Sequence, residues 1–230
     1  MTVFVLKIIA MVSMVLDHIK YAIPSTKCFA TIYLGRIAFP IFGFLISEGF
    51  IHTHSRSKYM LRILIFAIVS QIPFYFFAHN IVHSKVNFNI MFTFEIALVG
   101  LYLIDFIKNY DGFSKILDYS MMIIGLVIIL LFTYLIHPDY SSYGVLTVWI
   151  FYLLKKSKIL TSFSYVLLNF LYYFSMGYGQ EYKMLLATII PLLLILFYNG
   201  KQGRKLKYFF YVFYPVHFII LYAINYFFVR

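Results

Sequence analysis

The residues best suited to chemistry lie in the first apolar stretch, where Lys7, Asp17 and His18 interrupt otherwise uncharged sequence. On an α-helix, Lys7 and His18 share one face and lie about 16 Å apart along the axis. A cation at one end and an imidazole at the other suit a long anionic cofactor. Its phosphates would pair with Lys7, and its arm would run past Met11 and Met14 to His18. Imidazole titrates near neutral pH, so His18 can serve as a general base.

Asp17 follows a different face of the same helix, because adjacent helical residues do not point the same way. We expect it to pair with Arg36 of the next apolar segment. Arg36 would then either hold Asp17 or stabilise an oxyanion, since an unpaired guanidinium at membrane depth is costly. The alternative is structural: Lys7 reaches the membrane surface, and Asp17 and His18 form a buried polar cluster. Lys20, near the far end of the segment, is expected to reach the membrane surface in either case.

A second imidazole occurs near the end of the chain, in Tyr214-Pro215-Val216-His217. The proline interrupts a predicted helix and frees a backbone carbonyl, which is tolerated where protein covers it or where it lines a wet cavity. We expect His217 to face His18 across such a cavity, with Tyr214 in the wall. A lone buried histidine that only satisfies its own hydrogen bonds is the alternative.

Three further groups have more than one interpretation. Arg62 is either the partner of Glu48 in a salt bridge between two helices or a cofactor-binding residue. His52 and His54 have the spacing of a metal-binding pair, but two histidines in a wet loop are not sufficient, and no metal is expected. Glu95 lies within a predicted spanning helix, where it either has no chemical role or belongs to a proton path.

Composition defines the class of protein. Of the 230 residues, 63% are hydrophobic and only 12% are charged, whereas soluble domains are about one quarter charged. We therefore predict an all-α, polytopic integral membrane protein that forms a single domain over residues 1–230. The net charge of +11 is attributed to basic cytoplasmic loops rather than to nucleic-acid binding. The single cysteine, Cys28, excludes an internal disulfide.

The apolar segments that must position these residues predict about nine transmembrane helices. The segments 143–154 and 160–176 are short for spanning helices, which need roughly 20 residues. Either both cross a thinned bilayer or one of them is re-entrant. Prolines at positions 40, 73, 191 and 215 interrupt four of the nine. The first segment carries no cleavage pattern and is expected to be retained. The predicted ranges are 3–23, 29–51, 59–78, 88–107, 120–136, 143–154, 160–176, 183–199 and 207–228.

The distribution of basic residues predicts the orientation. The connections that follow the second, fourth, sixth and eighth predicted helices, together with the adjoining helix ends, are rich in Lys and Arg. The other connections and their adjoining ends hold only Lys27, Lys85 and Lys183, with Lys20 beside them. Basic loops stay on the cytoplasmic side, so the N-terminus is expected in the cytoplasm. The basic set comprises Arg56, Lys58, Lys108, Lys115, Lys155, Lys156, Lys158, Lys201, Arg204, Lys205 and Lys207.

Four stretches together resemble the TraX family of bacterial membrane proteins. The most specific are Gly-Arg-x-Ala-Phe-Pro, which begins at Gly35, and Phe-Tyr-x-Phe-Tyr-Pro-x-His, which ends at His217. The other two are residues 6–18, which end in Leu-Asp-His, and residues 59–73, which end in Gln-Ile-Pro. The resemblance covers both ends of the chain well and residues 110–200 loosely.

The resemblance implies a function. The TraX family is associated with acetylation of the pilin N-terminus, and it is similar to the wider transmembrane acyltransferase superfamily. In the type-three acyltransferases of this superfamily, the first helix carries an Arg followed by ten residues and a His. Lys7 takes the Arg position here, which keeps the charge but loses bidentate phosphate recognition, and His18 takes the His position. The implied fold is an acyltransferase-type helical bundle that binds acyl-CoA from the cytoplasm.

The sequence thus predicts a transmembrane acyltransferase of the bacterial cytoplasmic membrane that uses acetyl-CoA. Its acceptor is an amine or hydroxyl of a protein, such as a pilin, of a peptide or of the cell envelope. The predicted catalytic residues are His18, Asp17, Arg36 and His217, and the predicted cofactor-binding residues are Lys7, Met14, Arg62 and Tyr214. The alternative is a transporter or assembly factor that uses Asp17, His18 and Glu95 as a proton or substrate path.

Overall fold

The computed structural model describes residues 1–85, 87–110, 114–177 and 181–229. These residues form helices and connections without any β-strand; the one β-type contact is an isolated bridge between Phe88 and Pro138. Lys183 and Lys207, which contribute to the predicted charge asymmetry, have side chains outside the described set. The α-helices are α1 (Val3–Ala22), α2 (Phe29–Tyr33), α3 (Ala38–His52), α4 (Arg56–Phe77), α5 (Ile90–Lys108), α6 (Lys115–Ile136), α7 (Ser141–Leu153), α8 (Lys158–Met176), α9 (Glu181–Leu196) and α10 (Lys207–Phe228).

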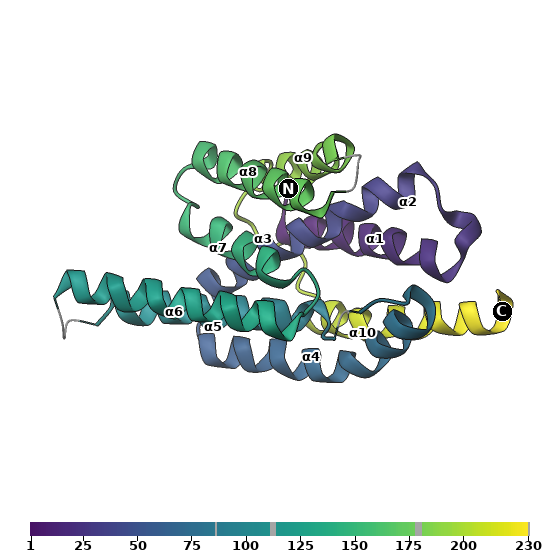
Figure 1. Cartoon of the computed structure of the whole chain (residues 1–230), viewed down its shortest axis with the longest axis horizontal. Coiled ribbons are helices and arrows are strands. Elements are labelled where there is room, and N and C mark those ends of the chain that lie inside the picture. Colours follow the sequence, from purple (N-terminus) through teal and green to yellow (C-terminus); the bar gives the residue numbers. More distant parts are fainter. Residues whose placement is uncertain (86, 111–113, 178–180, 230) are drawn as a thin grey trace.

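The helices pack in two groups, which meet where α7 packs against both α3 and α5 and where α1 packs against α10. Figure 1 shows α4, α5, α6 and α10 in the lower part of the molecule and α1, α2, α3, α8 and α9 above them. Helix α1 packs against α3 on one side and α10 on the other, and α10 packs against α4. The first and last helices of the chain are therefore neighbours, which brings together residues about 200 positions apart.

The prediction of an all-helical membrane protein is confirmed, but the predicted count of about nine transmembrane helices is not. Five helical stretches among the described residues are long and apolar enough to cross a membrane: Phe29–His52, Arg56–Val82, Ile90–Lys108, Lys115–Ile136 and Tyr208–Phe228. Helix α1 matches the predicted range 3–23 but carries three charged residues. Helix α7 has 13 residues, short of the roughly 20 that a span needs.

The predicted helix 29–51 is not continuous. A 3₁₀ segment, Leu34–Ile37, separates α2 from α3, and the hydroxyl of Ser13 in α1 donates to the carbonyls of Leu34 at 2.5 Å and Gly35 at 3.3 Å. A Cβ on Gly35 would lie 2.6 Å from Oδ1 of Asp17, closer than atoms can pack. The break therefore occurs where α1 approaches the second segment most closely, and only glycine allows that approach.

The prolines differ in their effect. Pro40 lies in the first turn of α3, where a missing N–H costs no helical hydrogen bond, and the predicted helix 29–51 is interrupted directly before it, at Leu34–Ile37. Pro73, Pro191 and Pro215 do lie inside helices. Near Pro73, the Oε1 of Gln71 accepts hydrogen bonds from both nitrogens of Asn89. That contact fixes the start of α5, because Asn89 is its N-cap.

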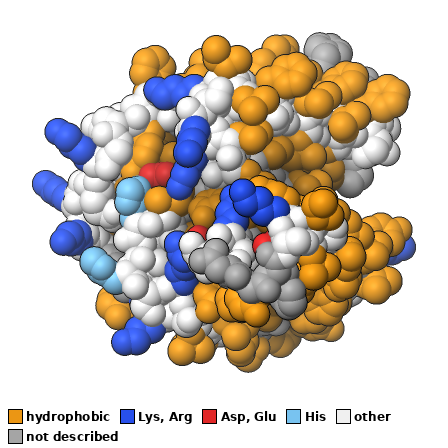
Figure 2. Space-filling view, turned by 90° about the vertical axis from the view of Figure 1, so that its left-hand side faces the viewer, with side chains coloured by type: hydrophobic (Ala, Val, Ile, Leu, Met, Phe, Trp, Pro, Cys, Tyr) orange, Lys and Arg blue, Asp and Glu red, His pale blue; other side chains and the backbone are white. Residues whose placement is uncertain are grey.

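Basic side chains collect at one end of the helix bundle. Figure 2 looks onto this end and shows many Lys and Arg side chains around a hollow, with hydrophobic side chains along the flanks. We call it the basic end. It is formed by the connections after α3, α5, α7 and α9, and its exposed cations are Lys58, Lys108, Lys115, Lys155, Lys156, Lys158, Lys201, Arg204 and Lys205.

Candidate active site

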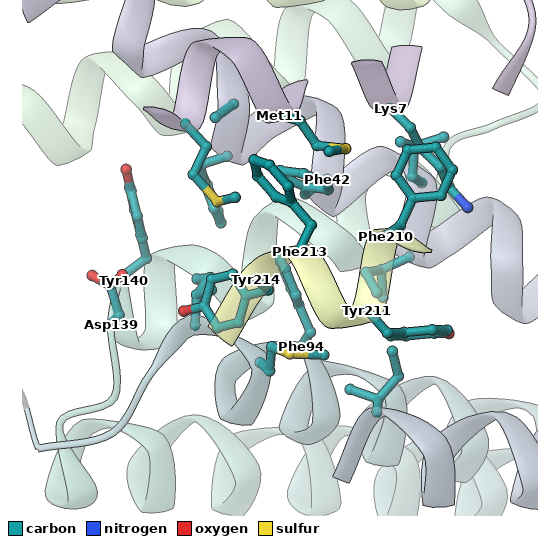
Figure 3. Close-up of a pocket in the computed structure, with 18 of the residues that line it drawn as sticks. Lys7, Met11, Phe42, Phe94, Asp139, Tyr140, Phe210, Tyr211, Phe213 and Tyr214 are labelled. Carbon is teal, nitrogen blue, oxygen red and sulfur yellow. The ribbon is translucent and has the colours of Figure 1, made fainter. Parts of the chain in front are cut away.

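A cavity of about 910 Å³ lies between α1, α3, α4 and α10, and it extends from the basic end toward the connection between α6 and α7. Lys7 and Phe210 lie at one side of the close-up in Figure 3, and Asp139 and Tyr140 lie at the other. Met11, Met14 and His18 line the cavity between them. The face of the first helix that carries Lys7, Met11, Met14 and His18 therefore lines one cavity.

The two predicted histidines are in direct contact. Nδ1 of His18 lies 3.0 Å from Nε2 of His217, and Nδ1 of His217 lies 3.2 Å from the carbonyl oxygen of Phe213. His18 lines the cavity, while His217 is 4% exposed. We predicted that the two rings face each other across the cavity. Instead they are in direct contact and are stacked, with centroids 5.1 Å apart.

This chain of hydrogen bonds selects the tautomers. A carbonyl oxygen only accepts, so the neutral His217 donates from Nδ1 and offers the lone pair of Nε2. His18 must then donate from Nδ1, which leaves its Nε2 with a free lone pair. Phe77 and Phe218 hold the His18 ring at centroid distances of 5.6 and 5.0 Å. The arrangement therefore presents an oriented base or nucleophile to the cavity.

Asp17 organises a cation cluster rather than assisting His18. Its Oδ1 lies 2.7 Å from Nη2 of Arg36, as predicted, and 2.5 Å from Nζ of Lys20. The expectation that Lys20 reaches the membrane surface is wrong, because its side chain is 6% exposed and pairs with Asp17. Asp17 and Arg36 both line the cavity. The Nε of Arg36 is buried and finds no hydrogen-bond partner among the described residues.

The cations nearest the basic end are free of carboxylates. Lys7 has its Nζ 4.7 Å from the centroid of Phe210, and none of the ion pairs between described residues includes Lys7 or Arg62. Glu48 pairs with His52 at 3.4 Å, so the salt bridge expected between Glu48 and Arg62 is wrong. Lys7 and Arg62 both line the cavity and remain available to a negatively charged ligand.

Met14 and Tyr214 line the middle of the cavity. Both are buried and belong to the main hydrophobic core. The hydroxyl of Tyr214 bonds to the backbone of Ile90 at the start of α5, so its position is set by packing and by that bond. These two residues shape the passage between Lys7 and His18 and add no charge to it.

Among the known families, one matches almost the whole chain. The family model described as TraX protein matches residues 3–225. The chain belongs to the TraX family. A relative from Dichelobacter nodosus, named probable fimbrial assembly protein FimC, serogroup H1, is 28% identical over 244 residues, which cover 95% of this chain and 93% of the relative. No solved structure matches the chain.

The sequence stretches that indicated the TraX family converge on this cavity. They contribute Lys7 and His18 from α1, Arg36 from the 3₁₀ segment, Arg62 from α4 and Tyr214 from α10. His217 contacts His18 through the hydrogen bond between their rings. The stretch that ends at Pro73 also holds the start of α5 through Gln71. The TraX stretches thus build one site from four parts of the chain.

Sequence reasoning missed Asp139 and Tyr140, which line this TraX protein's cavity from the connection between α6 and α7. Thr93 donates to the carbonyl of Asp139 at 2.5 Å, and the N–H of Asp139 donates to Phe88 at 2.9 Å. Burial, and next the charge of Asp17, raise the pKa of the Asp139 carboxyl to about 7. The available signal was an acidic residue placed directly after His-Pro at the end of a long apolar helix.

Glu95, in contrast, stands apart from this TraX site. It does not line the cavity, and its Oε2 is buried without a hydrogen-bond partner among the described residues. Asp17 and His18 lie on the cavity wall, whereas Glu95 does not join them there. The three residues of the predicted proton path therefore do not line one cavity among the described residues.

Proposed function

We propose that this TraX protein is a membrane acyltransferase that moves an acetyl group from cytoplasmic acetyl-CoA to an acceptor amine or hydroxyl. The observation that carries the proposal is that His18, whose Nδ1 is engaged by His217, lines the same cavity as Lys7 and Arg62, two cations outside the ion pairs between described residues. Along the same cavity there is room, in this order, for the charged end of the donor, for its arm and for its reacting carbonyl. Its dimensions and chemistry support a donor that is long, thin and anionic at one end.

The donor enters from the basic end in this proposal. Lys7 and Arg62 contact its phosphates, and the arm passes Met11 and Met14 between α1 and α10. The length of α1 between Lys7 and His18, about 16 Å, is of the order that an extended pantetheine arm spans. Neither cation pairs with a carboxylate of the described residues, so binding phosphate breaks no ion pair among them.

His18 then handles the proton. The lone pair of the acceptor nitrogen or oxygen forms a bond to the thioester carbonyl carbon, and Nε2 of His18 removes the acceptor's proton. The carbon–sulfur bond breaks, and the departing thiolate recovers that proton from His18. In the covalent variant, Nε2 first takes the acyl group and releases the thiolate, and the acceptor then removes the acyl group and delivers its proton to the thiolate.

Arg36 and His217 support the reacting groups. Arg36, held by Asp17 at 2.7 Å, is the cation of the cluster that lines the cavity, and it stabilises the carbonyl oxygen that gains charge. His217 accepts from Nδ1 of His18 and so keeps the reactive Nε2 deprotonated. Asp139, at the opposite end from Lys7, provides a carboxylate for an acceptor that carries an amine.

The proposed location is the bacterial cytoplasmic membrane, with the N-terminus in the cytoplasm. The concentration of Lys and Arg at the basic end supports this orientation, because such loops are retained inside the cell. The acceptor then reaches the site from the outer side. Pilin is the acceptor class favoured by the family and by the relative named as a fimbrial assembly protein; a peptide or an envelope polymer fits the same chemistry.

The test combines binding with the mass of the product. Purified protein in lipid discs should bind labelled acetyl-CoA, and Lys7→Ala should weaken that binding. Cells that carry His18→Ala should lack an acetyl increment on a surface polymer or pilin that wild-type cells show by intact mass. His79→Ala is the matched control, because His79 lies outside the cavity. Failure of the wild-type protein to bind any acyl-CoA contradicts the proposal.

The second candidate is a non-enzymatic assembly factor, which the name of the Dichelobacter nodosus relative favours. Such a protein would hold a pilin subunit and would need no acyl donor. It predicts that His18→Ala impairs assembly while the mass of the subunit stays the same in wild-type and variant cells. The mass comparison therefore separates the two candidates directly.

A further inference from the structure

A second cavity of about 390 Å³ adjoins the first at the basic end. Arg204 and Lys205 line only this second cavity, while Lys7, Val3, Gln202 and Phe210 line both. We call it the basic side pocket; its remaining lining residues are Phe4 and Leu206. The side pocket is thus an extension of the donor end of the site, and it contains cations that the mechanism above does not use.

The connection that carries these cations is held against the start of α1. The N–H groups of Val3 and Phe4 donate to the carbonyls of Lys201 and Gln202 at 2.9 and 3.1 Å. Gly203 adopts a φ of +72°, and a Cβ there would lie 2.8 Å from Oγ1 of Thr2. The backbone therefore holds Arg204 and Lys205 beside Lys7 in a defined arrangement.

The charges of the side pocket are uncompensated. None of the ion pairs between described residues includes Lys7, Arg204 or Lys205. Three cations around one cavity repel each other, and a polyphosphate relieves that repulsion through charge-assisted hydrogen bonds. The rings of Phe4 and Phe210, edge to face at 6.2 Å, add an apolar wall against which a planar base can pack.

We propose that the basic side pocket binds the phosphates of the donor's nucleotide, with Arg204 and Lys205 as the residues that select a nucleotide-bearing thioester. This inference rests on the proposed function for the identity of the donor. It divides donor recognition between two cavities: the nucleotide lies in the side pocket, and the acyl arm lies in the main cavity. Lys7, which lines both, contacts the phosphates at the junction, and Arg62 contacts them from the main cavity.

The experiment measures dissociation constants of the purified protein in phosphatidylcholine discs for acetyl-CoA, for S-acetylpantetheine, which lacks the nucleotide, and for ADP. The double variant Arg204→Ala/Lys205→Ala should weaken binding of acetyl-CoA and ADP about tenfold or more, the effect of losing roughly 1.4 kcal/mol. Its affinity for S-acetylpantetheine should stay unchanged. Equal loss for both thioesters, or no loss for either, overturns the inference.

Two controls separate the possible causes. Lys156→Ala/Lys158→Ala removes two exposed cations of the basic end that line neither cavity, so it should leave all three constants unchanged; an equal loss of ADP binding would mean a general charge effect and overturn the inference. Discs with phosphatidylglycerol test a lipid headgroup as the source of phosphate. If ADP fails to bind in phosphatidylcholine discs, the nucleotide assignment is wrong.

The proposed function and this inference fail in different ways. If ADP binds in a manner that depends on Arg204 and Lys205 but acetyl-CoA yields no acetylated product, the nucleotide site stands and the acyltransferase proposal is contradicted. If acetyl transfer depends on His18 but the double variant does not discriminate between thioesters, only the inference is contradicted.

Discussion

At the scale of single residues, the hydrogen bond between His18 and His217 does most to define the site. A free histidine can carry its proton on either nitrogen, but the carbonyl of Phe213 fixes one tautomer for His217 and hence one for His18. His217 is therefore a positioning residue, since it acts through His18 and is itself buried. Asp17, adjacent in sequence to His18, serves Arg36 and Lys20 instead.

This assignment predicts the effect of replacing His217. His217→Ala removes the acceptor for the Nδ1 proton of His18, so kcat for acetyl transfer should fall about 10- to 100-fold, the usual effect of losing a group that orients a functional histidine. KM for acetyl-CoA should change little, because the donor end is unaltered. Steady-state transfer assays measure both quantities.

The conservative variant distinguishes positioning from packing. His217→Gln can place an amide oxygen near the position of Nε2 and accept the same hydrogen bond, so it should recover part of the lost kcat. A His217→Ala variant with wild-type turnover would contradict the positioning role. Equal loss in the Gln and Ala variants would show that packing alone matters.

At the scale of elements, the break between α2 and α3 positions the cation cluster. The 3₁₀ segment Leu34–Ile37 places Arg36 beside Asp17, and the Ser13 hydroxyl donates to the carbonyls of Leu34 and Gly35 within the break. Gly35 permits the contact with α1 because it has no Cβ. A continuous helix over residues 29–51 would lose these contacts.

Glycine substitutions test this interpretation within one membrane segment. Gly35→Ala would place a Cβ 2.6 Å from Oδ1 of Asp17, so it should destabilise the protein by about 1–3 kcal/mol and reduce acetyl transfer. Gly43→Ala is the matched control, since its Cβ would meet Thr147 at an ordinary 3.5 Å. Thermal unfolding midpoints of the two variants in the same detergent measure the difference; similar midpoints would contradict the role of Gly35.

At the scale of the whole molecule, the direction of the cavity across the membrane decides which substrate enters where. The basic end carries Lys7 and the side pocket, while Cys28 lies at the connection between α1 and α2, at the opposite end of α1 from Lys7. Cys28 is exposed, and its hydrogen bonds to Thr31 lower the pKa of its thiol. It is the single cysteine of the chain, and so it can report orientation.

The orientation predicts a labelling pattern. A membrane-impermeant maleimide should label Cys28 in intact cells, because the proposed orientation places that end outside the cytoplasm. A Lys156→Cys variant in a Cys28→Ser background should react only after the membrane is permeabilised. Labelling of position 156 but not of Cys28 in intact cells would reverse the proposed direction and would place the donor end outside the cytoplasm.

The sequence alone determined the properties that depend on local composition and spacing. Long apolar runs predicted the helices, basic connections predicted a charged end, and the spacing from Lys7 to His18 predicted one cavity-lining face. Only the tertiary structure decided the contacts between distant segments. The His18–His217 hydrogen bond joins residues 199 positions apart, and Asp139 reaches the cavity through a connection anchored to Phe88 and Thr93. Helical periodicity says which face a residue occupies, but which helix packs against that face depends on the fold of the entire chain.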